Sequence, residues 1–155
     1  MKREYSLEGG EIFYVEAFRN FDFLRRFGYV LESFQSHGVE NHVVFTNVNI
    51  NRSVRIVLES YIWVNIERKK SFGFKRSSVI VDVTLLFEYF EAHHLLDQQL
   101  QIGTEFGYLK IEHIGKILKS YAEFIQSHLF PVIIGAKWID EIVDIRKLSN
   151  LKWRG

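Results

Sequence analysis

The stretch that most constrains the fold is residues 29–67, where four short segments of alternating apolar and polar residues follow one another closely. Alternation with a period of two, rich in Val and Ile, is typical of β-strands that bury one face. We expect strands at 29–35, 42–48, 53–59 and 61–67. The gaps between them are too short for crossover helices, so neighbouring strands should pair antiparallel as a meander.

Helical patterns flank this predicted sheet on both sides. Before it, residues 11–27 follow a flexible Gly9-Gly10 pair and carry an apolar stripe at helical spacing: Tyr14, Ala17, Phe18, Phe21 and Leu24. Gly28 follows, a residue that tolerates the left-handed conformation in which many helices end.

After the sheet, the periodicity predicts three more helices. The first covers 83–91 and is capped by Asp82, and the second begins between 104 and 110 and ends near Leu129, just before Pro131. The third covers 137–148. A run of strands followed by helices indicates an α+β fold: an N-terminal helix, a four-stranded antiparallel meander, and about three C-terminal helices packed on the sheet.

Composition sets limits on what the protein does. The length of 155 residues fits one domain, 1–155, and 47% hydrophobic residues can form a core. A net charge of +1 gives no overall attraction to nucleic acid or membranes, and the absence of Cys excludes disulfides and thiolate chemistry. The basic N-terminus is not followed by an apolar segment, and no apolar run reaches membrane-spanning length, so we expect a cytoplasmic protein.

The alternation assigns side chains to two faces of the predicted sheet. One face should carry the aliphatic residues of the third and fourth segments: Val54, Ile56, Leu58, Ile62, Val64 and Ile66. Arg55, Tyr61 and Trp63 then share the other face. Aromatic residues and Arg dominate the energetics of protein interfaces, so this second face is a candidate protein-binding surface, unless helices cover both faces.

Residues 67–78 are polar and basic, and we expect an exposed loop, after which 79–81 can add a short extended piece. Lys70-Ser71-Phe72-Gly73-Phe74 resembles the core of the RNP1 motif of RRM and cold-shock domains, in which aromatic side chains stack on bases. The sequence departs from that motif at Ser71, Lys75 and Ser77, and the predicted order of elements is not βαββαβ. Single-stranded nucleic-acid binding is therefore the alternative function, through Arg68, Lys69, Lys70, Phe72, Phe74, Lys75 and Arg76.

No motif gives positive support for an enzyme, a cofactor site or a metal site. The chain has no nucleophile elbow, phosphate-binding loop or dinucleotide-binding glycine pattern. Among its six His residues, Glu91, His93 and His94 form the one cluster with ligand-like spacing, yet residues two apart on a helix do not share a face. We expect no catalytic residues, no cofactor and no metal.

Short phrases along the chain resemble a group of small uncharacterised bacterial α+β proteins, some of which are similar to immunity proteins of toxin systems. The phrases are Phe23-Leu24 with Phe27-Gly28-Tyr29, Val54-Arg55-Ile56 with Tyr61-Ile62-Trp63-Val64, and Tyr121-Ala122 with Gly135 and Trp138. The resemblance implies a cytoplasmic protein that binds another protein, and it transfers no catalytic residue. The oligomeric state stays open.

Overall fold

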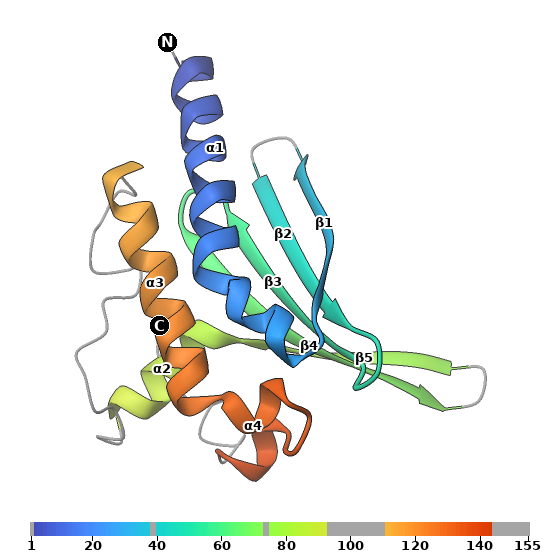
Figure 1. Ribbon diagram of the computed structural model, residues 1–155. Coiled ribbons are helices and arrows are strands. Elements are labelled where there is room, and N and C mark those ends of the chain that lie inside the picture. Colours follow the sequence, from blue (N-terminus) through green and yellow to red (C-terminus); the bar gives the residue numbers. More distant parts are fainter. Residues whose placement is uncertain (1, 38–39, 73–74, 93–110, 144–155) are drawn as a thin grey trace.

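The computed structural model describes residues 2–37, 40–72, 75–92 and 111–143. An N-terminal helix, α1 (Lys2–Phe21), continues into a 3-10 helix, η1 (Asp22–Phe27), and is followed by a run of strands and then by helices. The chain therefore has the α+β order that the sequence predicts (Figure 1).

The strands form one antiparallel sheet in the order β1-β2-β3-β4-β5. Their bounds are β1 (Val30–His37), β2 (Glu40–Asn47), β3 (Arg52–Leu58), β4 (Ile62–Phe72) and β5 (Lys75–Asp82). The prediction of a meander is confirmed, but the prediction of four strands is wrong because the sheet has five. Each strand pairs with the next one along the chain, so β1 and β5 are the two edges.

The extra strand, β5, begins inside the segment 67–78, where the sequence predicts an exposed loop, and continues through the short extended piece expected at 79–81. There β4 continues to Phe72 and pairs with β5 in an unbroken register from Asn65↔Asp82 to Phe72↔Lys75. The distal part of this hairpin projects beyond the helices in Figure 1. Strands that do not pack on helices need no buried face, so their polar sequence carries no apolar alternation that would reveal them.

The helices after the sheet are α2 (Val83–Ala92), α3 (Ile111–His128), the short α4 (Phe130–Ile133) and the 3-10 turn η3 (Ile139–Glu141). Asp82 caps α2 as predicted, because its Oδ1 accepts the Thr84 N–H at 2.8 Å. Where a helix was predicted from 137, the chain forms only η3 up to residue 143, and residues 144–148 lie outside the described part, as does the segment 93–110.

Residues before the predicted start of the first helix are also helical, since α1 includes Gly9 and Gly10. At its other end Gly28 has a φ of 89°, and its N–H bonds back to carbonyls of η1, as predicted for a helix-terminating glycine. The stripe of α1 and η1 that is fully buried consists of Phe13, Ala17, Phe21 and Leu24. Tyr14 and Phe18, predicted in this stripe, lie at its margin and are half-buried.

The core lies between the sheet and the helices on one face. Helices α1 and α3 run side by side across the front of the sheet, and α2 packs near one end (Figure 1). The sheet side of this core is the predicted aliphatic set: Val54, Ile56, Leu58, Ile62, Val64 and Ile66, all buried.

The opposite face of the sheet carries Arg55 and Trp63, and we expected it to be partly exposed to solvent. Its central strands are more buried than that. Val57 and Val44 point to this face, because they pair with Trp63 and Arg55 in the register, yet both are buried. The sheet therefore buries apolar side chains on both sides of its central strands.

Candidate protein-binding surfaces

Apolar side chains are exposed together along the edge strand β1. Val30, Leu31 and Phe34 have 62%, 40% and 56% of their surface accessible. One side of β1 pairs with β2, and the strand order leaves its other side without a neighbouring strand among the described residues. Edge strands in monomeric proteins are usually short, charged or covered, since an open edge can pair with another chain. The sequence of this edge is not rich in charge, and much of the surface of these three residues stays accessible.

A bulge in β1 directs its apolar residues to the helix side. The register shifts between Leu31 and Ser33, so Leu31 pairs with Phe45 and Phe34 pairs with Val43. Because Phe45 and Val43 face the core, Leu31 and Phe34 project toward α1 although they are three residues apart. Without the extra residue, strict alternation would send one of them to the opposite face.

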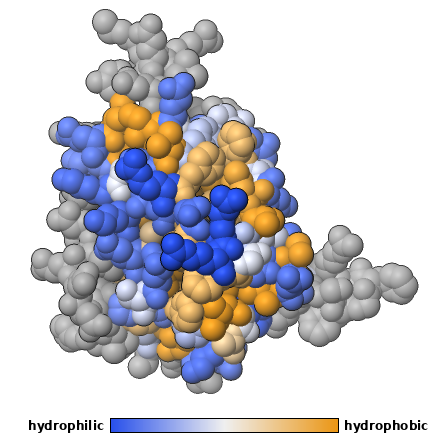
Figure 2. Space-filling model, in the orientation of Figure 1, coloured by the Kyte–Doolittle hydropathy of each residue, from blue (hydrophilic) through white to orange (hydrophobic). Residues whose placement is uncertain are grey.

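Phe34 extends an aromatic cluster at the margin of α1. Its ring meets those of Tyr14 and Phe18 edge to face, with centroids 5.6 and 5.7 Å away. Edge-to-face packing is a favoured geometry for aromatic pairs, so the cluster holds Phe34 in place while more than half of its surface stays accessible. Figure 2 shows hydrophobic side chains along the region where α1 meets β1, beside strongly hydrophilic ones.

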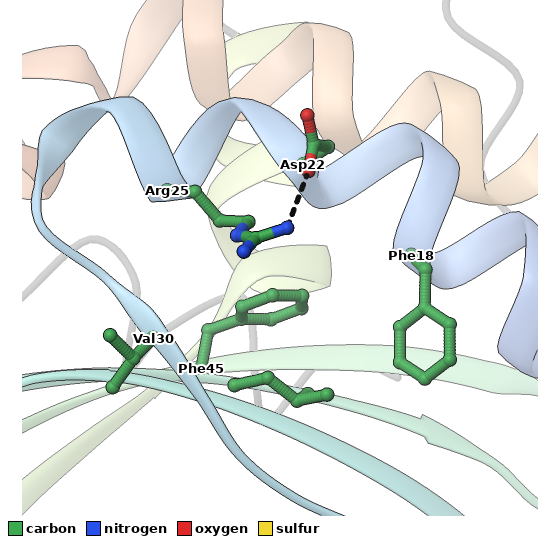
Figure 3. A pocket seen from close by; sticks show the side chains of 6 residues that line it. Phe18, Asp22, Arg25, Val30 and Phe45 are labelled. Carbon is green, nitrogen blue, oxygen red and sulfur yellow. Dashed lines mark ion pairs between the residues drawn. The ribbon is translucent and has the colours of Figure 1, made fainter.

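An open groove of about 520 Å³ lies between β1 and the helical segment formed by the end of α1 and η1. Figure 3 shows Asp22 and Arg25 of η1 on one side of it, with Val30 and Phe45 of the sheet on the other. Phe18 and Leu31 complete the lining. The Arg25 guanidinium and the Asp22 carboxylate lie 3.6 Å apart at the rim, and both are well exposed. The groove thus has an apolar floor and a polar rim, which is the usual anatomy of an interface.

The pairing register of β3 and β4 shows how the residues of the predicted binding face, Arg55, Tyr61 and Trp63, are arranged. Arg55 and Trp63 lie diagonally on adjacent strands of one face, since Arg55 pairs with Asn65 and Val57 pairs with Trp63. Tyr61 lies in the tight turn between β3 and β4 and is 53% exposed. Whether these residues bind a protein stays a prediction.

His42 and Glu40 join this face and were not among the predicted site residues. The His42 ring lies 6.4 Å from the Trp63 ring, across the intervening Val57, and Arg55 Nη1 lies 3.4 Å from His42 Nδ1. Glu40 Oε2 lies 2.7 Å from His42 Nε2. Two residues apart on a strand share a face, so the spacing of Glu40 and His42 was a usable sequence signal. The rings of His42 and Trp63 flank Val57, which helps to explain its burial.

The predicted nucleic-acid segment is part of the β4–β5 hairpin rather than a loop. The structure describes the side chains of Arg68 and Lys69, while those of Lys70, Phe72, Phe74, Lys75 and Arg76 lie outside the described residues. The Arg68 side chain packs on an aromatic ring, because its guanidinium carbon lies 4.6 Å from the centre of the Trp138 ring. Nucleic-acid binding by this segment stays a prediction.

The described histidines are engaged in packing or in pairs. The His128 ring packs on those of Phe90 and Phe124, with centroids 5.0 and 5.2 Å away. Within 2–37, 40–72, 75–92 and 111–143, no three His, Asp or Glu side chains gather as a metal-binding group. The cluster at His93 and His94 lies outside these ranges.

Acidic residues of the sheet lie at opposite ends of it. Glu40 and Glu59 flank the end where Asn41 pairs with Leu58, while Glu67 pairs with Ser53 at the other end. The three carboxylates therefore do not gather into one acid pair or cluster. Among the described helices, none combines the length and apolar character needed to cross a bilayer.

Comparisons of the chain with protein-family models, with curated proteins and with solved structures found no match. Function therefore has to be inferred from the chain's own residues.

Proposed function

We propose that this chain is a non-enzymatic protein-binding module that receives an extended segment of its partner along β1. The observation that carries the proposal is the coincidence of an edge strand with three exposed apolar residues and an adjoining apolar groove. In strand addition, backbone hydrogen bonds to the edge supply affinity, and pockets for alternate side chains supply specificity. The edge of β1 can offer the backbone hydrogen bonds, and the groove beside it can receive side chains.

The β1 edge is favoured over the face of Arg55, Tyr61 and Trp63 because of where apolar surface is accessible. Binding energy comes mainly from apolar and aromatic anchors that lose water on association. Beside Arg55 and Trp63 the aliphatic side chains of the central strands, Val44 and Val57, are already buried, whereas Leu31 and Phe34 on β1 are exposed. Polar and aromatic groups of the Arg55 face remain a second surface that the same experiment can detect.

The partner segment should be extended and should carry apolar side chains at alternate positions, since every second residue of an added strand would face the groove. The resemblance to immunity proteins adds that the partner is a toxin. A toxin-type reading frame beside the gene would supply a specific protein with which to test this part of the proposal.

The test is selection of linear peptides from a displayed library, followed by affinity measurement on three variants. Leu31→Lys and Phe34→Lys place a charge in the proposed path, and Val48→Lys is the matched control, because Val48 is an apolar residue with 75% of its surface accessible in the turn after β2, outside strand β1. Circular dichroism establishes that each variant is folded.

We expect selected peptides to bind the control like the wild type and to lose at least about tenfold in affinity, roughly 1.4 kcal/mol, on each β1 variant. Peptides that bind all three variants equally would refute strand addition at β1. If no peptide is enriched and single-stranded RNA or DNA binds instead, with loss on Phe72→Ala and Phe74→Ala, the alternative function takes its place.

A further inference from the structure

Two arginines and a tryptophan form a compact cluster at the end of the sheet near α4. Arg52, at the start of β3, and Arg68, within β4, are direct cross-strand partners. They share the helix-side face, because the next pair on that face is the buried Val54↔Ile66. Trp138, which precedes η3, lies against both: the guanidinium carbons are 4.7 and 4.6 Å from its ring centre.

The cluster holds two positive charges, and no described residue places an acid against them. Among the described residues, no carboxylate lies within ion-pair distance of Arg52 or Arg68. Arg52 is only 7% exposed, and its side chain makes one long hydrogen bond, from Nη1 to the Ile50 carbonyl at 3.4 Å. The Nε atoms of both arginines are buried and have no hydrogen-bond partner.

Such an arrangement is costly for a site that only packs. A buried cation without a counter-ion loses hydration, and two like charges side by side repel each other. Both effects act on Arg52: burial lowers the pKa of its guanidinium, and the neighbouring Arg68 lowers it further. Stacking on Trp138 offsets part of this cost, but it leaves the N–H donors of the guanidinium groups unpaired.

Nearby polar groups do not supply the missing acceptors. The Tyr29 hydroxyl donates to the Ile133 carbonyl at 2.8 Å, and the Glu141 carboxylate accepts the backbone N–H of Trp138 at 2.7 Å. These bonds fix the position of α4 and η3, and no described hydrogen bond or ion pair joins either group to Arg52 or Arg68. No residue in the described ranges offers the arginines a negatively charged acceptor, and Arg68, which is partly exposed, gives access to them from solvent.

We propose that Arg52 and Arg68 bind a phosphate group of a small molecule, over the ring of Trp138. A phosphate monoester carries a charge of about −1.5 to −2 near neutral pH, which matches two guanidinium groups. Its three terminal oxygens accept the forked N–H groups of arginine in a bidentate manner. The ligand is either free inorganic phosphate or the phosphate of a phosphomonoester.

Thermal unfolding of the whole chain tests this site. The midpoint is measured against inorganic phosphate, with NaCl holding the ionic strength constant, and again with glycerol 2-phosphate and with acetate. Arg68→Gln removes one of the two cations, and Arg25→Gln is the matched control, because Arg25 is an exposed arginine in a separate ion pair.

For the wild type and for Arg25→Gln we expect a rise that saturates, reaching roughly 5–10 °C at a hundred times the dissociation constant. Arg68→Gln should need at least about ten times more phosphate. A larger response to glycerol 2-phosphate than to phosphate identifies a phosphomonoester as the ligand, and the reverse identifies free phosphate.

Equal responses of Arg68→Gln and the wild type, or a rise that never saturates, would overturn the proposal, because excluded anions stabilise any folded protein in that way. An acetate response equal to that of phosphate would also overturn it. If Arg68→Gln does not fold, line broadening of the inorganic phosphate 31P signal by the wild type decides the matter. Broadening that Arg68→Lys weakens supports the site, and no broadening refutes it.

Discussion

Removing the hydroxyl of Tyr121 should destabilise this protein more than removing any exposed tyrosine hydroxyl. Tyr121 is 1% exposed on α3, and its hydroxyl donates to the Ile62 carbonyl at the start of β4, at 3.1 Å. The Thr84 hydroxyl of α2 lies 2.6 Å away. Because the single Tyr121 proton goes to Ile62, Thr84 must donate to Tyr121. One oxygen therefore joins α3, β4 and α2.

The magnitude follows from these two bonds. A typical hydrogen bond contributes about 1 kcal/mol net, and a buried group left without its partner costs about 1–3 kcal/mol. Tyr121→Phe removes both bonds and leaves the Ile62 carbonyl without this donor, so we expect a loss of about 2–3 kcal/mol. For a chain of this length that corresponds to roughly 5–10 °C in the unfolding midpoint.

Urea unfolding of four proteins measures the effect: wild type, Tyr121→Phe, Thr84→Val and the double variant. The coupling energy of this cycle should be about 1 kcal/mol, because the Thr84 bond is lost only once. Tyr61→Phe is the control, since Tyr61 is exposed and should change stability by less than about 0.5 kcal/mol. A Tyr121→Phe protein within about 0.5 kcal/mol of the wild type would refute this reasoning.

Three further predictions concern pH and chain conformation. Burial raises the pKa of Tyr29 and Tyr121. Their contribution to the stability of the folded state is therefore complete below about pH 10, the pKa of tyrosine in the unfolded chain, and stability should fall by about 1.4 kcal/mol per pH unit for each tyrosine above it. Alkaline unfolding curves that Tyr29→Phe leaves unchanged would contradict this. Gly28→Ala should lower the free energy of unfolding by about 1–2 kcal/mol, because φ is 89° and a Cβ would lie 3.0 Å from the Asn47 amide nitrogen. A melting temperature equal to that of the wild type would show that the alanine is not strained there. Asp82→Ala should lose about 1 kcal/mol of helix capping that Asp82→Asn largely keeps, and equal losses in urea titrations would show that capping is not the cause.

The sequence predicted the parts of the fold that periodicity controls. Strands β2 and β3 alternate between a buried and a second face, and their bounds differ from the prediction by at most two residues. The helix-side face was predicted from the same alternation. Gly28 and Asp82 were recognisable because a left-handed helix end and an N-cap each favour few residue types.

The β4–β5 hairpin and the shape of the C-terminal region had little such signal, since only the extended piece at 79–81 pointed to part of β5. Strand β5 and the distal half of β4 are held by pairing with each other, so polar residues such as Lys69 and Ser78 suffice there. Around Trp138 the apolar spacing suggested a helix, but the chain turns as η3 to place the indole ring against Arg52 and Arg68. That contact joins residues far apart in the sequence, which local patterns do not encode.

The candidate sites, like the fold, could be predicted from the sequence only in part. A meander places its first strand at an edge, so the exposure of β1 followed from the predicted topology, although the sequence interpretation looked instead to Arg55, Tyr61 and Trp63. The groove beside Leu31 depends on the bulge at Ser33, and no residue type there marks a bulge. The Arg52–Trp138–Arg68 cluster depends on register and on tertiary packing together.

The central claim is that a partner's strand adds to β1, and amide hydrogen exchange tests it most directly. Exchange is measured residue by residue for the free protein and for its complex with a selected peptide. We predict slowed exchange at the β1 amides that do not bond to β2, with no change at Val57 or Trp63 on the opposite face. Unchanged β1 amides together with slowed exchange around Arg55 and Trp63 would contradict the account and place binding on the other face of the sheet.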